Sequence, residues 1–129
     1  MGNKITDNLK IGTLGELLVQ LRLLQFNVQA APPIKDTGND LIAIRGEVFR
    51  SIQVKTTAGG NFQKRRLPKH YHVLALVNLS ANDAGLYLDD SKIYLVPRAA
   101  IKKAGGIPKK LDSYLLSEGL VDELFPVPA

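Results

Sequence analysis

The stretch that decides the fold is GNDLIAIRGEVFRSIQVKTT, residues 38–57. Two runs within it, DLIAIRG and EVFRSIQVKTT, are rich in β-branched and aliphatic residues, a composition typical of β-strands. Gly46 and Glu47 stand where the two runs meet, and a tight turn at this point is the most economical connection. The stretch therefore predicts a β-hairpin.

Three polar side chains interrupt this apolar hairpin. Asp40 opens the first run, and Gln53 and Lys55 lie near the end of the second. Because side chains alternate between the two faces of a strand, Gln53 and Lys55 point the same way. Because hairpin strands are antiparallel, the start of the first strand lies beside the end of the second. We therefore expect Asp40, Gln53 and Lys55 to converge at one end of the sheet.

This set of groups suits the hydrolysis of a phosphodiester bond. A carboxylate and an amide oxygen are ligands that a hard cation such as Mg²⁺ accepts, with Mn²⁺ as its substitute. A neighbouring lysine can position an attacking water or stabilise anionic charge. A metal ion and a lysine together neutralise the charge that develops on phosphorus during hydrolysis.

The order of these residues resembles the PD-(D/E)XK nuclease superfamily. That superfamily has a helix bearing a glutamate, a strand bearing an aspartate, and a strand bearing Glu, Asp or Gln, then any residue, then Lys. Here Glu16 matches within GTLGELLVQLRLLQF, and Asp40, Gln53 and Lys55 match the other positions. The resemblance, which is closest to the Gln-x-Lys subgroup with its homing-type members, implies a restriction-endonuclease-like core: a mixed central β-sheet flanked by helices.

The resemblance also implies roles for these residues. Asp40, Gln53 and the backbone carbonyl of Val54 would hold the metal ion, and Glu16 would reach it directly or through water. Lys55 would orient or activate the nucleophilic water, and DNA would be the substrate. Gln53 stands where most members carry Glu or Asp, so the site has one negative charge fewer and is expected to bind the cation more weakly.

The rest of the chain predicts a single α/β or α+β domain over residues 1–129. Apolar residues at helical spacing predict a helix over about residues 6–25, with one broad buried face. Its members are Ile11, Leu14, Leu18 and Leu21, widened by Leu17, Leu23 and Leu24. The other expected elements are a short strand in 28–33, a buried strand over 71–80, a second hairpin turning at 89–91, a helix from Pro97 to Ala104, and a helix over about 110–124.

Charge favours a polyanionic partner. The net charge is +5, and such an excess attracts nucleic acid. A basic loop follows the hairpin, and it predicts contacts to the nucleic-acid backbone through Lys64, Arg65, Arg66 and Lys69. The sequence has no cysteine, which removes disulfides and thiolate zinc sites. With no long apolar run and no secretory signal, we expect a cytoplasmic protein with no membrane partner.

Simpler interpretations stand beside these. Glu16 could be a solvated helix residue, Asp40 a residue that caps its own turn, and Lys55 a charge that protects a strand edge. A charge run such as the basic loop is usually a solvated surface. The nuclease-like fold could also serve as a DNA-binding or assembly module without catalysis, or have no nucleic-acid role. Because one active site cuts one strand, we expect a nuclease of this size to form a homodimer or a higher homo-oligomer.

Overall fold

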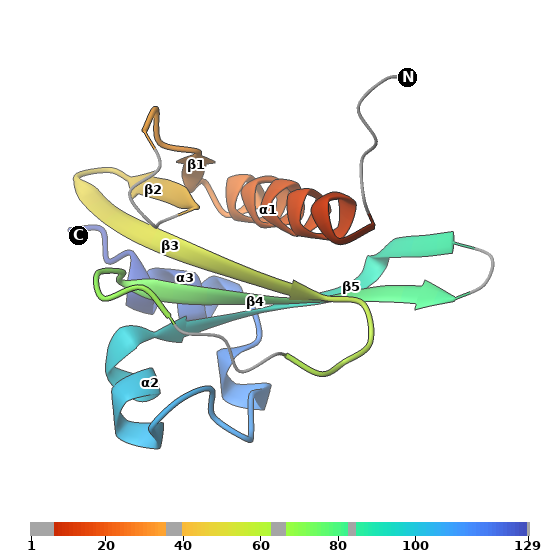
Figure 1. Ribbon diagram of the computed structural model, residues 1–129. Helices are drawn as coiled ribbons and strands as arrows, with labels where there is room; N and C mark the ends of the chain where they lie inside the picture. Colours follow the sequence, from red (N-terminus) through yellow and green to blue (C-terminus); the bar gives the residue numbers. More distant parts are fainter. Residues whose placement is uncertain (1–6, 36–39, 63–66, 83–84, 129) are drawn as a thin grey trace.

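The structure, a computed structural model, describes residues 7–35, 40–62, 67–82 and 85–128. It is a mixed α/β domain in which a five-stranded sheet is accompanied by three α-helices (Figure 1). The elements are α1 (Asp7–Gln25), β1 (Gln29–Ala31), β2 (Leu41–Arg45), β3 (Val48–Thr57), β4 (Val73–Asn82), β5 (Gly85–Pro97), α2 (Arg98–Ala104), the 3₁₀ helix η1 (Asp112–Tyr114) and α3 (Glu118–Leu124).

The strands lie in the order β1-β2-β3-β4-β5. Only β3 and β4 pair in parallel, and the other neighbours are antiparallel, so the sheet is mixed as the sequence predicts. The hairpin of β2 and β3 is confirmed: Arg45 pairs with Val48, and Gly46 takes a φ of 60° in the turn. A residue with a Cβ rarely adopts that backbone conformation, which explains a glycine at this point.

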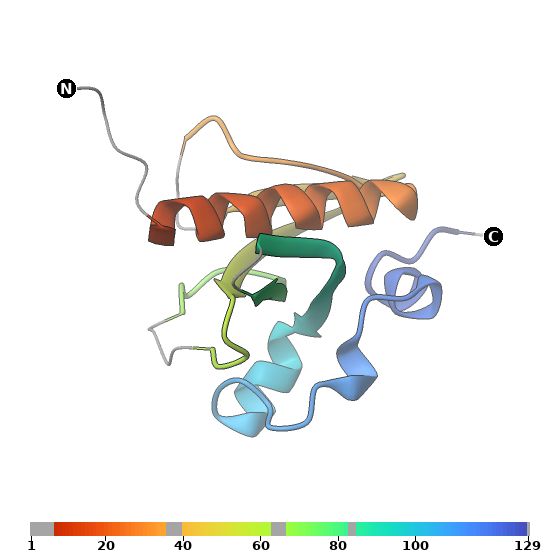
Figure 2. The same ribbon diagram turned by 90° about the vertical axis from the view of Figure 1, so that its right-hand side faces the viewer.

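Alternating residues of β4 face two separate cores. Val73, Ala75 and Val77 belong to a core that includes residues of α1 and α3, whereas Leu74 and Leu76 belong to a core built with α2. Both views of the chain place α1 and α2 on opposite sides of the sheet (Figures 1 and 2). We call these sides the α1 face and the α2 face. β4 is buried on both, which explains its almost continuous apolar sequence.

The helix α1 packs only part of the predicted set of residues against the sheet. Leu18, Val19 and Leu23 are buried, but the side chains of three other leucines are 55% to 58% exposed. These three are Leu17, Leu21 and Leu24. The prediction is confirmed for Ile11, Leu14, Leu18 and Leu23, which pack against the core, and is wrong for these three. Leucines occur on both sides of the helix, so their spacing alone does not define the edges of the packed side.

The predicted turn at residues 89–91 is wrong, because β5 runs through these residues without a break. Its hairpin partner is β4, with Asn82 opposite Gly85, and the outer parts of both strands extend beyond the rest of the sheet (Figure 1). Ser91 is buried, and its Oγ accepts a hydrogen bond from the Ser80 N–H at 2.9 Å and donates one to the Tyr87 carbonyl at 3.0 Å. The polar residues that suggested a turn therefore lie where the register of the two strands shifts, between the pairs Asn78–Lys92 and Ser80–Tyr87.

The chain after β5 follows the prediction in part. The helix expected from Pro97 to Ala104 is confirmed as α2, which ends at Gly105 with a φ of 71°. The single helix expected over 110–124 is two short helices, because Leu115 forms a bridge with β5 between them. Ser117 then caps α3 by accepting a hydrogen bond from the Leu120 N–H at 3.2 Å.

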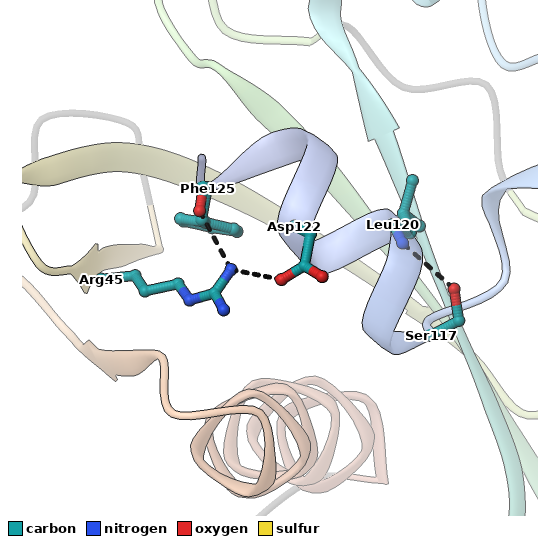
Figure 3. A network of polar contacts seen from close by, with 5 residues as sticks. All are labelled: Arg45, Ser117, Leu120, Asp122 and Phe125. Atoms are coloured by element: carbon teal, nitrogen blue, oxygen red, sulfur yellow. Dashed lines mark hydrogen bonds and ion pairs between the residues drawn. The ribbon is translucent and has the colours of Figure 1, made fainter. Parts of the chain in front are cut away.

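Two arginines of the hairpin fix the end of α3 against the sheet. Arg45 donates to the Asp122 carboxylate at 2.8 Å and to the Phe125 carbonyl at 3.1 Å (Figure 3). Arg50 donates to the carbonyl of Leu124 at 3.0 Å. Cationic donors at a helix C-terminus satisfy carbonyls that have no partner within the helix. The turn end of the hairpin is thus anchored on α3, and its other end lies near α1.

Gly15 lets α1 approach β3 closely, and this contact predicts a stability difference. A Cβ at Gly15 would fall 2.8 Å from both Cβ and Cγ2 of Thr56 and closer still to its Oγ1, whereas a Cβ at Gly12 would meet nothing within 4 Å. We expect Gly15→Ala to lower the free energy of unfolding by about 1–3 kcal/mol through overpacking. Gly12→Ala, in the same helix, should be neutral or stabilising by about 0.5–1 kcal/mol.

Urea denaturation of the two variants and the wild type measures this difference. Thr56→Ala should restore part of the lost stability in the Gly15→Ala background, because it removes the atoms that crowd the new methyl group. Equal stability of the two alanine variants would contradict the close contact between α1 and β3.

Candidate functional site

The end of β3 extends beyond its hairpin partner. The first residue of β2, Leu41, pairs with Ile52, and β3 continues to Thr57 with β4 on its other side. Within the described part of the chain, residues 53–57 therefore have a strand on one side only. We call this segment the β3 overhang. Its backbone groups on the side of β2 are not used in a β-ladder among the described residues.

Asp40 occupies the start of this free side. Its N–H donates to the Ile52 carbonyl at 3.1 Å, and its Oδ2 accepts a hydrogen bond from the Val54 N–H at 2.8 Å. The N–H and C=O of one strand residue point toward the same neighbour. The Val54 carbonyl therefore points to the side on which the Asp40 carboxylate lies, so two oxygen donors share this edge of the sheet.

Gln53 and Lys55 lie on the α2 face. They pair with Leu74 and Leu76 of β4, both of which belong to the core on that face. Side chains at paired positions of neighbouring strands point to the same side of a sheet. The Asp40 carboxylate is bonded to Val54, the residue between them, so the three residues lie at the same end of the hairpin.

The side-chain oxygen of Gln53 lacks a visible partner. Gln53 Oε1 is buried and accepts no hydrogen bond from any residue that the structure describes. A buried acceptor without a partner costs about 1–3 kcal/mol, so such atoms usually face a water, an ion or a ligand. The sequence pattern predicts this same side chain, that of Gln53, as a metal ligand.

Glu16 approaches the same strand from the α1 face. It follows Gly15, which lies against Thr56, and Thr56 follows Lys55 in β3. Glu16 is partly buried at the border of the packed side of α1. Glu16, Asp40 and Lys55 each have at least one polar or electrostatic interaction partner. The fold therefore places Asp40, Gln53 and Lys55 at the β3 overhang, and it packs α1 against the other face of the overhang at the residue before Glu16.

These donors fit a hard divalent cation. A carboxylate oxygen of Asp40, the Val54 carbonyl and the orphaned amide oxygen of Gln53 are all oxygen ligands, which Mg²⁺ and Mn²⁺ prefer. The described residues contain no group of three or more His, Asp or Glu side chains placed to hold a metal. The candidate set does not need one, because two of its donors are an amide and a backbone carbonyl.

The structure describes only part of the basic loop. Lys64, Arg65 and Arg66 lie outside the described residues, so the structure does not place them. Lys69 is described and exposed, and it lines a hollow together with Arg98 and Lys102. Arg98 could not be identified from the sequence, because no local pattern after β5 indicates that this arginine lies beside the segment before β4.

In comparisons with known proteins, no protein-family model, curated protein or solved structure matches the chain. Among the described residues, no helix has the length and apolar character needed to span a membrane.

The hydrogen bond between Asp40 and Val54 predicts how two substitutions of Asp40 affect stability. Asp40→Ala leaves the Val54 N–H without its acceptor, which should lower the free energy of unfolding by about 1–3 kcal/mol. Asp40→Asn keeps an oxygen at the same place, and we expect a change within about 0.5 kcal/mol. Urea denaturation in the absence of divalent metal measures both variants. An Asp40→Ala protein as stable as the wild type would show that this bond does not hold the overhang.

Proposed function

We propose that the protein is a Mg²⁺-dependent endonuclease of the PD-(D/E)XK kind that hydrolyses phosphodiester bonds in DNA. The observation that carries the proposal is the Asp40 carboxylate, hydrogen-bonded to Val54 at the β3 overhang. The orphaned oxygen of Gln53 and the amine of Lys55 belong to the residues on either side of Val54. The mixed sheet with a helix packed on β3 is compatible with a restriction-endonuclease-like core. We also propose a cytoplasmic location, where a DNA substrate is abundant.

The residues divide the chemistry between them. Asp40, Gln53 and the Val54 carbonyl would hold the cation, and Glu16 would complete the site directly or through a water. When bound, Mg²⁺ or Mn²⁺ supplies Lewis-acid stabilisation of the charge on the phosphoryl oxygens and lowers the pKa of water. Lys55 contributes an ammonium group that orients the attacking water and stabilises negative charge on the phosphate.

Gln53 determines how strongly the site holds its cation. An amide oxygen is an adequate ligand, but it lacks the Coulombic attraction of a carboxylate. Mg²⁺ commonly binds through one or two carboxylates plus substrate phosphates and waters. With Asp40 and Glu16 as its only carboxylates, the site would bind the cation better with DNA present than alone.

The neutral Gln53 also supports a second candidate function. A nuclease-like domain with a weak metal site could bind DNA or assemble with it and not cleave it. Salt-sensitive DNA binding without metal-dependent cleavage on any substrate would favour this function. No binding to DNA even at low salt would exclude both.

Cleavage assays distinguish the two functions. With Mg²⁺ or Mn²⁺, we expect the wild type to nick supercoiled plasmid or branched DNA, and Lys55→Ala to reduce the rate by at least about 100-fold, the typical effect of removing one charge-stabilising group. Asp40→Asn should lose activity although it keeps its fold. The control variant Lys110→Ala lacks an exposed lysine that is distant in sequence from the site. This variant should cut DNA at the wild-type rate. Equal rates for all four proteins would overturn the assignment of the site.

We also propose that the protein acts as a homodimer, and the outer side of α1 supports this. Leu17, Leu21 and Leu24 are spaced by four and three residues and form one exposed stripe opposite the packed side of the helix. A stripe of identical side chains is complementary to its own copy across a twofold axis. This spacing is that of a coiled-coil seam, in which two helices pack along their leucines.

Sedimentation velocity tests the dimer. The wild type should sediment as a dimer, and Leu21→Lys should shift it to a monomer because the seam then holds a charge. Phe49→Lys is the matched control, since Phe49 is 57% exposed but lies on β3 away from α1. A monomeric wild type, or equal loss of the dimer in both variants, would argue against the seam.

A further inference from the structure

A basic hollow lies on the α2 face, between α2 and the segment that leads into β4. Its volume is about 560 Å³, and it is open to solvent. Four of its lining side chains are basic or imidazole groups, and none of the described lining residues is acidic. The lining residues are Leu67, Pro68, Lys69, His70, Tyr71, Arg98, Ile101, Lys102, Gly105 and Gly106.

The charges come from two segments that face each other. Lys69 and His70 belong to the segment before β4, whereas Arg98 and Lys102 belong to α2. Arg98 and Lys102 are four residues apart, so they lie on the same side of the helix. Gly105, which ends α2 with a φ of 71°, and the following glycine border the hollow without side chains. Cations on both sides and backbone at the rim suit a compact anion.

Arg98 is held in place by its neighbours. Its guanidinium lies 5.9 Å from the centre of the Tyr71 ring, and its backbone N–H donates to the His72 carbonyl at 3.0 Å. Tyr71 is itself buried in the core on this face. Burial raises the pKa of the Tyr71 phenol, and the charge of Arg98 acts in the opposite direction. An arginine stacked on an aromatic ring keeps its fork of donors ordered, which suits bidentate binding of a phosphate.

The hollow lies on the same side of the sheet as Gln53 and Lys55. Both these residues and the hollow are on the α2 face. Val73, where β4 begins beside the hollow, is level with Ile52, and Leu76 is level with Lys55. At about 3.3 Å per strand residue, Lys55 is about 10 Å further along the sheet than the start of β4. This offset corresponds to roughly three base pairs of duplex DNA at 3.4 Å each.

We propose that this hollow binds a backbone phosphate of DNA a few nucleotides away from the bond at Lys55, and so directs the strand across the α2 face. The inference rests on the proposed function for the identity of the ligand. It does not require cleavage, because a phosphate contact acts in binding whether or not the metal site is active. Arg98 and Lys102 are then contacts that position the substrate, and not catalytic residues.

DNA binding in EDTA, where no metal-dependent cleavage occurs, tests the hollow by itself. The variant Arg98→Gln/Lys102→Gln is compared with Lys109→Gln/Lys110→Gln, which removes the same charge from exposed lysines that do not line the hollow. Binding of a fluorescent duplex is measured over a range of salt concentrations. We expect the slope of log Kd against log salt to fall by about 1 in the hollow variant, as for the loss of one phosphate contact, and by clearly less in the control.

Two further measurements make the outcome decisive. Lys102→Glu alters one exposed residue, so it should weaken DNA binding without unfolding the protein, which circular dichroism verifies. Titration with inorganic phosphate, followed by NMR, shows whether the hollow binds free phosphate and not the phosphates of DNA. Phosphate binding that Arg98→Gln/Lys102→Gln abolishes, together with unchanged DNA affinity, would overturn the proposal.

These results separate the hollow from the nuclease. A weaker salt dependence in the hollow variant supports the hollow even if the wild type cuts no DNA. Cleavage that depends on Lys55, with equal DNA affinity in the hollow and control variants, would contradict phosphate binding in the hollow and still support the nuclease activity.

Discussion

The hydrogen bond from the Val54 N–H to the Asp40 carboxylate is the contact on which the candidate site depends. β2 pairs with β3 only up to Ile52. At Val54 the Asp40 side chain accepts the hydrogen bond that the backbone of a partner strand would otherwise accept. A carboxylate has two oxygens and room for several hydrogen-bond or metal partners, so accepting one bond does not exhaust it. Asp40 thereby serves the fold as the cap of a strand edge and presents negative charge beside the Val54 carbonyl.

The surrounding elements hold this edge in place from three directions. Arg45 and Arg50 fix the opposite end of the hairpin to α3, α1 packs against the overhang through Gly15, and β4 pairs with its other side. Alternation along β3 then separates two tasks. Ile52 and Val54 are buried in the core on the α1 face, whereas Gln53 and Lys55 face the side on which the basic hollow lies.

The local parts of this arrangement could be predicted from the sequence. The hairpin and the position of Asp40 relative to Gln53 and Lys55 follow from the strand period and one glycine turn, so they need no knowledge of distant contacts. The packed side of α1 could be predicted only in part, because leucines cover both sides, and the close approach at Gly15 depends on the absence of a side chain. The register shift near Ser91 could not be predicted, because the residues there have the composition of a turn. The hollow joins residues from segments far apart in the sequence, and no local pattern links Lys69 to Arg98.

The location of a bound Mn²⁺ ion tests the central claim most directly. Crystals soaked in Mn²⁺ and measured by anomalous diffraction should show one ion at the β3 overhang, within about 2.0–2.3 Å of oxygens from Asp40, Gln53 and the Val54 carbonyl. Asp40→Asn crystals treated in the same way should lose most of that signal. An ion bound elsewhere, or an overhang that stays empty at millimolar Mn²⁺ both with and without DNA, would contradict the account.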